Sequence, residues 1–260
     1  MGSNVCDQND TSAGVNGGPA HAPASEAVTF RPTASKLPPA RALAWSLVLN
    51  VIFVGVFGFW VARRLASPGR PDGLQRMRAD HFHDLVRGSK GADIVMLGDS
   101  NIQFAEWSEL MNRPVANRGI AGDTIDDVRQ RLEDVVVLRP KILFLLVGCN
   151  DLQRGATPQE VAQKHSALVR ELQARLPTTR LVVQALLPIH RPQRTSPAAI
   201  AETNALLARA AEAEGVAFLD VGRALEDPTG QLDPRYSLDG LHVSGEGYRV
   251  WANMLLPLPP

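Results

Sequence analysis

The sequence is poor in cysteine and has no excess charge of either sign. Only two of its 260 residues are cysteine, Cys6 and Cys149, which excludes a disulfide framework and a zinc site built mainly of thiolates. The 27 basic residues balance 27 acidic ones, so no positive excess is left to neutralise phosphates and nucleic acid is not an expected partner. With 45% hydrophobic residues, the chain is long enough for one good core or two small ones.

Residues 1–40 are nearly devoid of aromatic side chains and show neither strand nor helical periodicity. They are rich in Gly, Pro, Ala, Ser and Asn. Such a segment cannot bury enough apolar surface to offset the entropy lost on ordering. We therefore expect a disordered tail.

Charge is absent from Ala42 to Ala62, a run of 21 residues. A helix of this length spans about 30 Å, the thickness of the hydrocarbon core of a bilayer. Trp45 and Trp60 lie near its two ends, where indole rings favour the membrane interface. A buried core helix is seldom apolar on every side, and a cleaved signal peptide has a shorter apolar core. The sequence therefore predicts a single transmembrane helix over 41–64.

The orientation of this helix is weakly specified. Within twenty residues, the N-terminal flank carries three Lys or Arg and the C-terminal flank carries five. This small excess of positive charge favours a cytoplasmic C-terminal domain by a thin margin. A difference of two residues leaves the side of the membrane open.

Residues 65–90 are expected to form a polar linker and a short helix, and 91–260 a single catalytic domain. In that domain, apolar runs alternate with helical patterns. The expected strands are 94–97, a second ending near 117, 141–147, 181–187 and 216–219, and the expected helices are 124–138, 157–176, 198–214 and 244–256. Strands that are apolar throughout are covered on both faces, and the repeated strand–helix order gives parallel pairing. This predicts an α/β fold, a three-layer α/β/α sandwich with a parallel flavodoxin-like sheet.

Four polar blocks fall at the predicted ends of strands or at the start of the last helix. They read GDS at 98–100, NRGIAGDT at 117–124, GCND at 148–151 and DGLH at 239–242. Ligands of such sheets bind at the carboxyl ends of the strands, so the four blocks should meet in one crevice. Each block is a weak signal alone, whereas the ordered set indicates one site.

The residue types in these blocks suit ester hydrolysis through an activated serine. Ser100 would be the nucleophile, His242 the general base, and Asp239 the group that orients the imidazole. His190, which follows the fourth strand, is a rival base. The oxyanion would be bound by the backbone N–H of Ser100, the N–H of Gly119 or Gly122, and the side-chain amide of Asn150. The residues themselves do not decide between the two glycines.

In order and content, the four blocks resemble the signature blocks of the SGNH hydrolases, also called the GDSL esterase/lipase family. The second and third blocks are most similar to a bacterial branch that resembles platelet-activating-factor acetylhydrolases. Asn101 replaces the Leu of GDSL, at a position that varies in the family. The resemblance implies a serine esterase without cofactor or metal, with Gly122 as the oxyanion donor. It favours acetyl esters and implies an extracytoplasmic domain, in contrast to the count of flanking charges. The expected substrate is a small acyl ester on a lipid or sugar of the cell envelope.

The remaining polar residues near the blocks are expected to be structural. Three carboxylates should hydrogen-bond to nearby loops: Asp99, Asp123 and Asp151. Cys149 lacks a base of its own and is expected to be a small buried side chain.

No catalytic role is expected for three further histidines. His81 and His83, two residues apart on a helix, point in different directions and have no evident third ligand, so no metal site is expected. His165 lies among polar neighbours in a predicted helix and is expected at the surface.

Two other functions remain open at this level. The same scaffold could be a non-catalytic module that binds a phosphate or another ligand at its first loop, although Asn150 and the Asp239–His242 pair would then have no role. A membrane-tethered adaptor that has lost activity is the other. The function that the residues favour is a membrane-anchored serine esterase.

Overall fold

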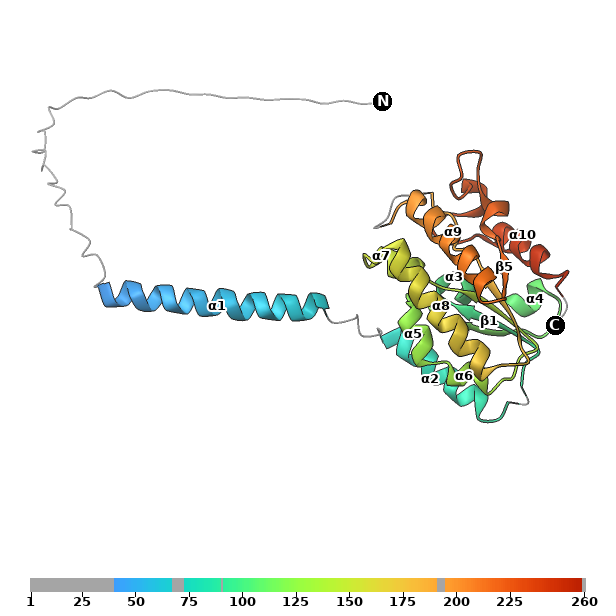
Figure 1. Cartoon of the computed structure of the whole chain (residues 1–260), viewed down its shortest axis with the longest axis horizontal. Coiled ribbons are helices and arrows are strands. Elements are labelled where there is room, and N and C mark those ends of the chain that lie inside the picture. The colour runs from blue at the N-terminus through green and yellow to red at the C-terminus, as the bar shows by residue number, and fades with distance from the viewer. Residues whose placement is uncertain (1–39, 67–72, 90, 191–194, 259–260) are drawn as a thin grey trace, which may run out of the picture. The chain divides into compact units, whose positions relative to one another are not determined.

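The structure is a computed structural model that describes residues 40–66, 73–89, 91–190 and 195–258. The chain divides into two compact units, Met1–Ser67 and Pro68–Pro260 (Figure 1). Except for Ala40, the predicted tail lies outside the described residues.

The described part of the first unit is helix α1 (Ala40–Ala66). Its described side chains, at positions 44–58, are all exposed, including Trp45, Leu49 and Phe53. Phe53 and Phe57 stack with ring centroids 6.1 Å apart. In the portions of the chain that the structure describes, no helix combines the length and the apolar character needed to cross a bilayer. The transmembrane helix over 41–64 therefore stays a prediction.

The second unit is built on a five-stranded parallel sheet in the order β2-β1-β3-β4-β5. The strands are β1 (Ile94–Gly98), β2 (Ala116–Gly119), β3 (Ile142–Leu146), β4 (Arg180–Gln184) and β5 (Ala217–Leu219). This is the flavodoxin-like strand order, in which the direction of winding reverses next to β1. The predicted parallel sheet is confirmed, and the reversal places the end of β1 at the usual site of ligand binding.

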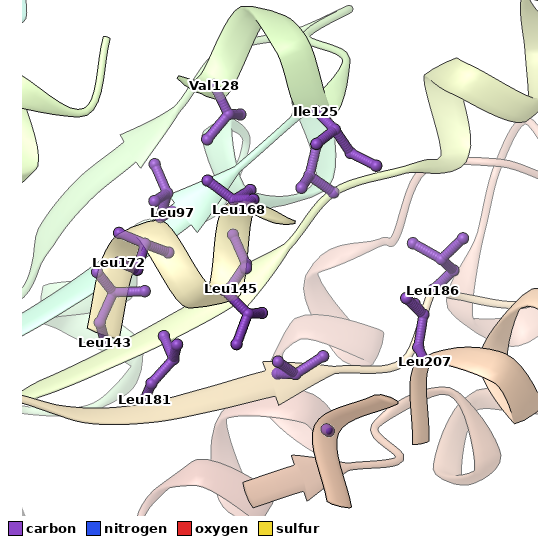
Figure 2. Packing of buried hydrophobic residues seen from close by; sticks show 14 of the residues in the cluster. Leu97, Ile125, Val128, Leu143, Leu145, Leu168, Leu172, Leu181, Leu186 and Leu207 are labelled. Atoms are coloured by element: carbon purple, nitrogen blue, oxygen red, sulfur yellow. The ribbon is translucent and has the colours of Figure 1, made fainter. Parts of the chain in front are cut away.

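One face of the sheet is covered by the helices that the sequence analysis expected between successive strands. These are α5 (Ile125–Gln130), α6 (Glu133–Val136), α8 (Pro158–Arg175) and α9 (Pro197–Ala213). Figure 2 shows Val128 of α5 and Leu168 and Leu172 of α8 packed with Leu97 and Leu145 of the sheet, all at most 1% exposed. The capping box predicted at the start of α8 is present, with Thr157 and Glu160 bonded to each other's backbone N–H.

The opposite face of the sheet is covered by α3 (Ser100–Gln103), α4 (Trp107–Leu110) and α10 (Gly245–Leu255). Ile94 and Met96 point to this side while Val95 and Leu97 point to the other, as strand alternation requires. Here Trp107, Tyr248 and Trp251 form a buried aromatic cluster with centroid separations of 5.0–5.9 Å. The sheet and the helices packed on each of its two faces therefore form three layers, as predicted.

Four short elements complete the second unit. They are α2 (Gly73–Val86), α7 (Cys149–Gln153), and the 3-10 turns η1 (Gly222–Leu225) and η2 (Pro234–Tyr236). The short helix expected in 65–90 is α2, which buries Phe82 at 3% exposure and lies beside α6 (Figure 1).

Two expected elements differ from the structure. The expected helix 124–138 is divided into α5 and α6 at Arg131, whose side chain makes a buried ion pair and bonds to the carbonyl of Gly98. The strand expected over 181–187 is shorter in the structure and ends at Gln184. Beyond it, Asn204 of α9 bonds through its side chain to both the N–H and the carbonyl of Leu186, each at 2.8 Å. The side-chain amide of Asn204 thus satisfies the backbone groups that strand pairing would otherwise satisfy.

Candidate active site

Ser100 lies at the tight junction between β1 and α3. Gly98 ends the strand, and a Cβ at this position would lie 2.0 Å from the carbonyl oxygen of Leu146, so only glycine fits. Asp99 caps the helix by accepting a hydrogen bond from the N–H of Asn101 at 3.1 Å. Ser100 is therefore the first helical residue, where a backbone N–H has no partner within the helix. The side chain is partly exposed and the N–H is available to an anion.

The structure brings Ser100, His242 and Asp239 together. His242 Nε2 lies 3.0 Å from Ser100 Oγ, across 142 positions of sequence. His242 Nδ1 lies 2.7 Å from Asp239 Oδ2. With the proton on Nδ1, that nitrogen donates to the carboxylate and Nε2 accepts from the serine hydroxyl, which is the arrangement a general base needs.

The loop itself fixes the orientation of Asp239. Its Oδ1 accepts the backbone N–H groups of Leu241 at 2.9 Å and His242 at 2.7 Å, so both carboxylate oxygens are engaged. Partial burial acts to raise the pKa of Asp239, but these two N–H groups and the imidazole outweigh it and leave the pKa well below its usual value. The carboxylate therefore stays ionised and stabilises a positive charge on His242.

Besides the N–H of Ser100, the candidate oxyanion donors are the N–H of Gly122 and the side-chain amide of Asn150. Gly122 has a φ of +83°, a conformation that favours glycine. Asn150 Nδ2 donates to the carbonyl of Asp123 at 3.0 Å, which uses one of its two hydrogens and leaves the other. Asn150 sits at the start of α7, after Gly148, whose φ of +132° turns the chain.

The two glycines of the second block have different surroundings. Gly119 is the last residue of β2, and a Cβ there would lie 2.3 Å from the backbone nitrogen of Gln103. It is therefore needed for close packing of β2 on α3. Gly122 lies beyond the strand in the loop next to Asn150, a position that favours it as the donor.

His190, the rival base, contacts the loop that carries Asp239 and His242 through a backbone hydrogen bond. Its N–H donates to the carbonyl of Gly240 at 2.9 Å, and its residue is exposed. In the part of the chain that the structure describes, its ring makes no hydrogen bond with Ser100 or Asp239, whereas that of His242 makes both.

The carboxylates expected to be structural, Asp99, Asp123 and Asp151, are buried and form hydrogen bonds with neighbouring groups. Asp151 accepts the N–H of Ile125 at 3.0 Å, and Asp123 accepts from Arg131 Nε at 2.8 Å. Burial raises the pKa of Asp123 to about 6 against the pull of Arg131, and raises that of Asp99 to about 7. Asp99 is only 1% exposed and contacts neither His242 nor Asp239 through any hydrogen bond that the described residues make.

Two expectations about burial have opposite outcomes. Cys149 is 7% exposed, which confirms a small buried side chain, and burial raises the pKa of its thiol to about 12. The surface position expected for His165 is wrong, because it is 2% exposed in the core face of α8. Its polar sequence neighbours point away on the other side of the helix, and burial lowers its pKa to about 4.

The described residues contain no group of three or more His, Cys, Asp or Glu placed to hold a metal ion. Of the histidine pair on α2, His83 contacts Asp134 through Nδ1 at 3.3 Å and His81 is exposed.

The sequence analysis missed Phe104, which follows α3. Its ring meets the His242 ring edge-on, with centroids 5.2 Å apart, although its side chain is half exposed. A groove of about 540 Å³ runs from it between α4 and α10, lined also by Glu106, Leu110, Tyr248 and Arg249. The only sequence signal was the spacing of four residues from Ser100, which places Phe104 one helical turn beyond it.

The family model of the GDSL-like lipase/acylhydrolase family matches residues 97–250 of this chain, from the end of β1 into α10. The chain belongs to this family. The match spans more than half of the 260 residues and contains all four polar blocks. The rat platelet-activating factor acetylhydrolase IB subunit alpha2 is 31% identical over 169 residues, which cover 61% of this chain and 72% of that protein.

Solved structures of GDSL-type proteins share the fold of this family member. A GDSL-like lipase from Bacteroides thetaiotaomicron superposes with a TM-score of 0.60 at 19% identity, covering 68% of this chain and 94% of that one. An acetyl xylan esterase superposes with a TM-score of 0.55 at 19% identity, covering 63% and 98%. At this identity the likeness is one of fold.

Proposed function

We propose that this GDSL family member is a serine esterase that hydrolyses small acyl esters, acetyl esters among them, through an acyl-serine intermediate. The observation that carries the proposal is the continuous chain of contacts from Ser100 Oγ to His242 Nε2 and from His242 Nδ1 to Asp239. The relatives named as an acetylhydrolase and an acetyl xylan esterase support acetyl groups as the acyl part.

The reaction follows from this arrangement. His242 Nε2 takes the proton of Ser100 as its oxygen bonds to the ester carbonyl carbon. The carbonyl oxygen becomes an oxyanion that the N–H groups of Ser100 and Gly122 and the amide of Asn150 stabilise. The carbon–alkoxide bond then breaks, and the imidazolium returns the proton to the leaving alcohol. Water, deprotonated by the same imidazole, then bonds to the acyl carbon. The bond from this carbon to Ser100 Oγ breaks, the imidazolium returns its proton to Oγ, and the acyl group leaves as a carboxylic acid.

The test is covalent labelling of the full-length protein with a fluorophosphonate probe, together with hydrolysis of p-nitrophenyl acetate, butyrate and octanoate. We expect the probe on the Ser100 peptide and the fastest turnover with the shortest acyl chains. Ser100→Ala should lose both labelling and turnover, whereas Ser89→Ala, at an exposed serine outside the four polar blocks, should keep both. An active Ser100→Ala protein would refute the proposal, and a folded wild type without labelling would favour a non-catalytic binding module.

We also propose that residues 41–64 anchor the protein in a membrane as a single helix. The 21 uncharged residues from Ala42 and the exposed apolar side chains of α1 support this. After carbonate extraction of cells, the full chain should remain with the membranes. The variant Phe53→Lys/Phe57→Lys should move to the soluble fraction, and retention of both proteins in the soluble fraction would exclude the anchor.

A further inference from the structure

Helix α2 bonds to the loop that carries Gly122, although it precedes the residues that the family model matches. Gln75 Nε2 donates a hydrogen bond to the carbonyl oxygen of Ala121 at 2.9 Å. Arg78, three residues along the same helix, donates from Nε to the carbonyl oxygen of Gly119 at 2.6 Å. Two side chains of one helix therefore hold two carbonyls of this loop.

The carbonyl that Gln75 binds belongs to the same peptide group as the N–H of Gly122. A trans peptide group is planar, and its C=O and N–H point in opposite directions. A hydrogen bond from Gln75 to this oxygen therefore directs the N–H of Gly122 away from α2. It also polarises the peptide group, which strengthens the N–H as a donor to a negative oxygen.

The absence of a side chain at Gly122 leaves room for the amide of Gln75. A Cβ at Gly122 would lie 2.8 Å from Gln75 Nε2, so any side chain would crowd the amide. On its other side the loop is fixed by Gln103, whose Oε1 accepts the N–H of Ala121 at 2.7 Å. Arg154 donates to the carbonyl of Gly122 at 2.7 Å. Both peptide groups that flank residue 122 are thereby bonded, which leaves the N–H of Gly122 with one defined direction.

Phe82 anchors α2, and Gln75 with it, against Arg118 and Arg131 of the rest of the domain. This ring is 3% exposed, and the guanidinium groups of Arg78 and Arg118 lie 4.9 and 4.7 Å from its centroid. Arg118 is itself only 6% exposed. Stacking of this kind, out of water, fixes a helix more firmly than an exposed contact does.

We propose that Gln75 is a positioning residue that sets the direction of the Gly122 N–H, and that the functional unit of this enzyme therefore includes α2. The proposal rests on the esterase function proposed above. Because the N–H bonds to an oxyanion only in the transition state, loss of Gln75 should lower kcat and leave KM nearly unchanged.

The experiment uses the full-length chain with Gln75→Glu and Gln75→Met. Glutamate is isosteric but presents an acceptor to the Ala121 carbonyl, and methionine has similar length without any N–H. We expect kcat for p-nitrophenyl acetate to fall by about tenfold or more, less than the 10²–10³ typical of losing a donor outright. KM should change by less than about twofold. The matched control is Gln159→Met on α8, which loses an exposed bond to Glu202 and should keep wild-type kcat.

The outcomes separate this inference from the proposed function. If the wild type is labelled at Ser100 and both Gln75 variants keep wild-type kcat, only the positioning role of Gln75 falls. A rise in KM at constant kcat would also overturn it, because Gln75 would then act on ground-state binding. If the wild type is neither labelled nor active, the esterase function fails and the inference fails with it. A fall in kcat with an unchanged unfolding temperature, in either variant, supports the proposal.

Discussion

Arg131 and Asp123 form a buried ion pair that joins the second polar block to the end of β1. The Nε–Oδ2 distance is 2.8 Å and the two side chains are 8% and 5% exposed. A second nitrogen of Arg131 donates to the carbonyl of Gly98 at 3.0 Å, one residue before Asp99 and two before Ser100. The pair thereby links the loop of Gly122 to the strand that precedes Ser100.

Removing one member of this pair should be costly. Arg131→Met leaves the Asp123 carboxylate buried without its partner, so we expect the free energy of unfolding to fall by about 3–5 kcal/mol. Urea denaturation of the wild type and variant measures this difference. Arg129→Met is the control, because Arg129 pairs with Glu171 at the surface and should cost less than about 1 kcal/mol. Equal effects of the two variants would contradict a structural role for the buried pair.

The side-chain amide of Asn150 should matter for turnover more than for substrate binding. Asn150→Ala removes a proposed oxyanion donor, and we expect kcat to fall by about 10²–10³ with KM nearly unchanged. Because Asn150 also bonds to the carbonyl of Asp123, the unfolding temperature is measured alongside. Gln153→Ala, at the end of the same helix α7, should leave kcat near that of wild type. Wild-type kcat in Asn150→Ala would remove this amide from the mechanism.

Stability in acid should depend on His165. Its pKa is lowered to about 4 by burial, so between about pH 6.5 and pH 4 the unfolded chain binds this proton and the folded protein does not. This contribution to the free energy of unfolding is present above pH 6.5 and is lost as the pH falls, by up to about 3 kcal/mol. Asp99 and Asp123, with pKa values raised to about 7 and about 6, act in the opposite direction.

The contribution of His165 is isolated by comparison with His165→Leu, in which both carboxylates are retained. Between pH 7 and pH 4, the wild type should lose more unfolding free energy in urea than the variant loses. Parallel pH profiles of the two proteins would show that folding does not lower the pKa of His165.

Phe104 should contribute to substrate binding at the mouth of the groove beside His242. Phe104→Ala removes an exposed ring that can pack against an ester group, so KM should rise by about two- to tenfold. The measurement is KM for acetyl esters of alcohols of increasing size. Val137→Ala, which removes another half-exposed apolar side chain away from the site, should leave KM unchanged. If KM of Phe104→Ala stays at the wild-type value for every alcohol, the groove does not hold the leaving group.

Much of the fold follows from local pattern. The apolar runs at 94–97 and 141–147 predict buried parallel strands, and the Thr157–Glu160 capping box predicts the start of α8, where the structure has it. The helix over 124–138 fails as a single element because the long-range bonds of Arg131 decide where it breaks. His165 is misplaced for a related reason, since sequence neighbours do not reveal which helical face packs inward.

The sequence alone determined the parallel α/β class, the order of the four polar blocks and the residue types that suit an activated serine. Those features depend on periodicity and local chemistry, which the chain carries in short segments. Only the tertiary structure decided the contacts that join Ser100, His242 and Asp239, and that Gln75 of α2 bonds to the peptide group preceding Gly122. The long-range contacts among these join positions 142 and 46 residues apart, and they are set by how helices and strands pack rather than by any local preference of the chain.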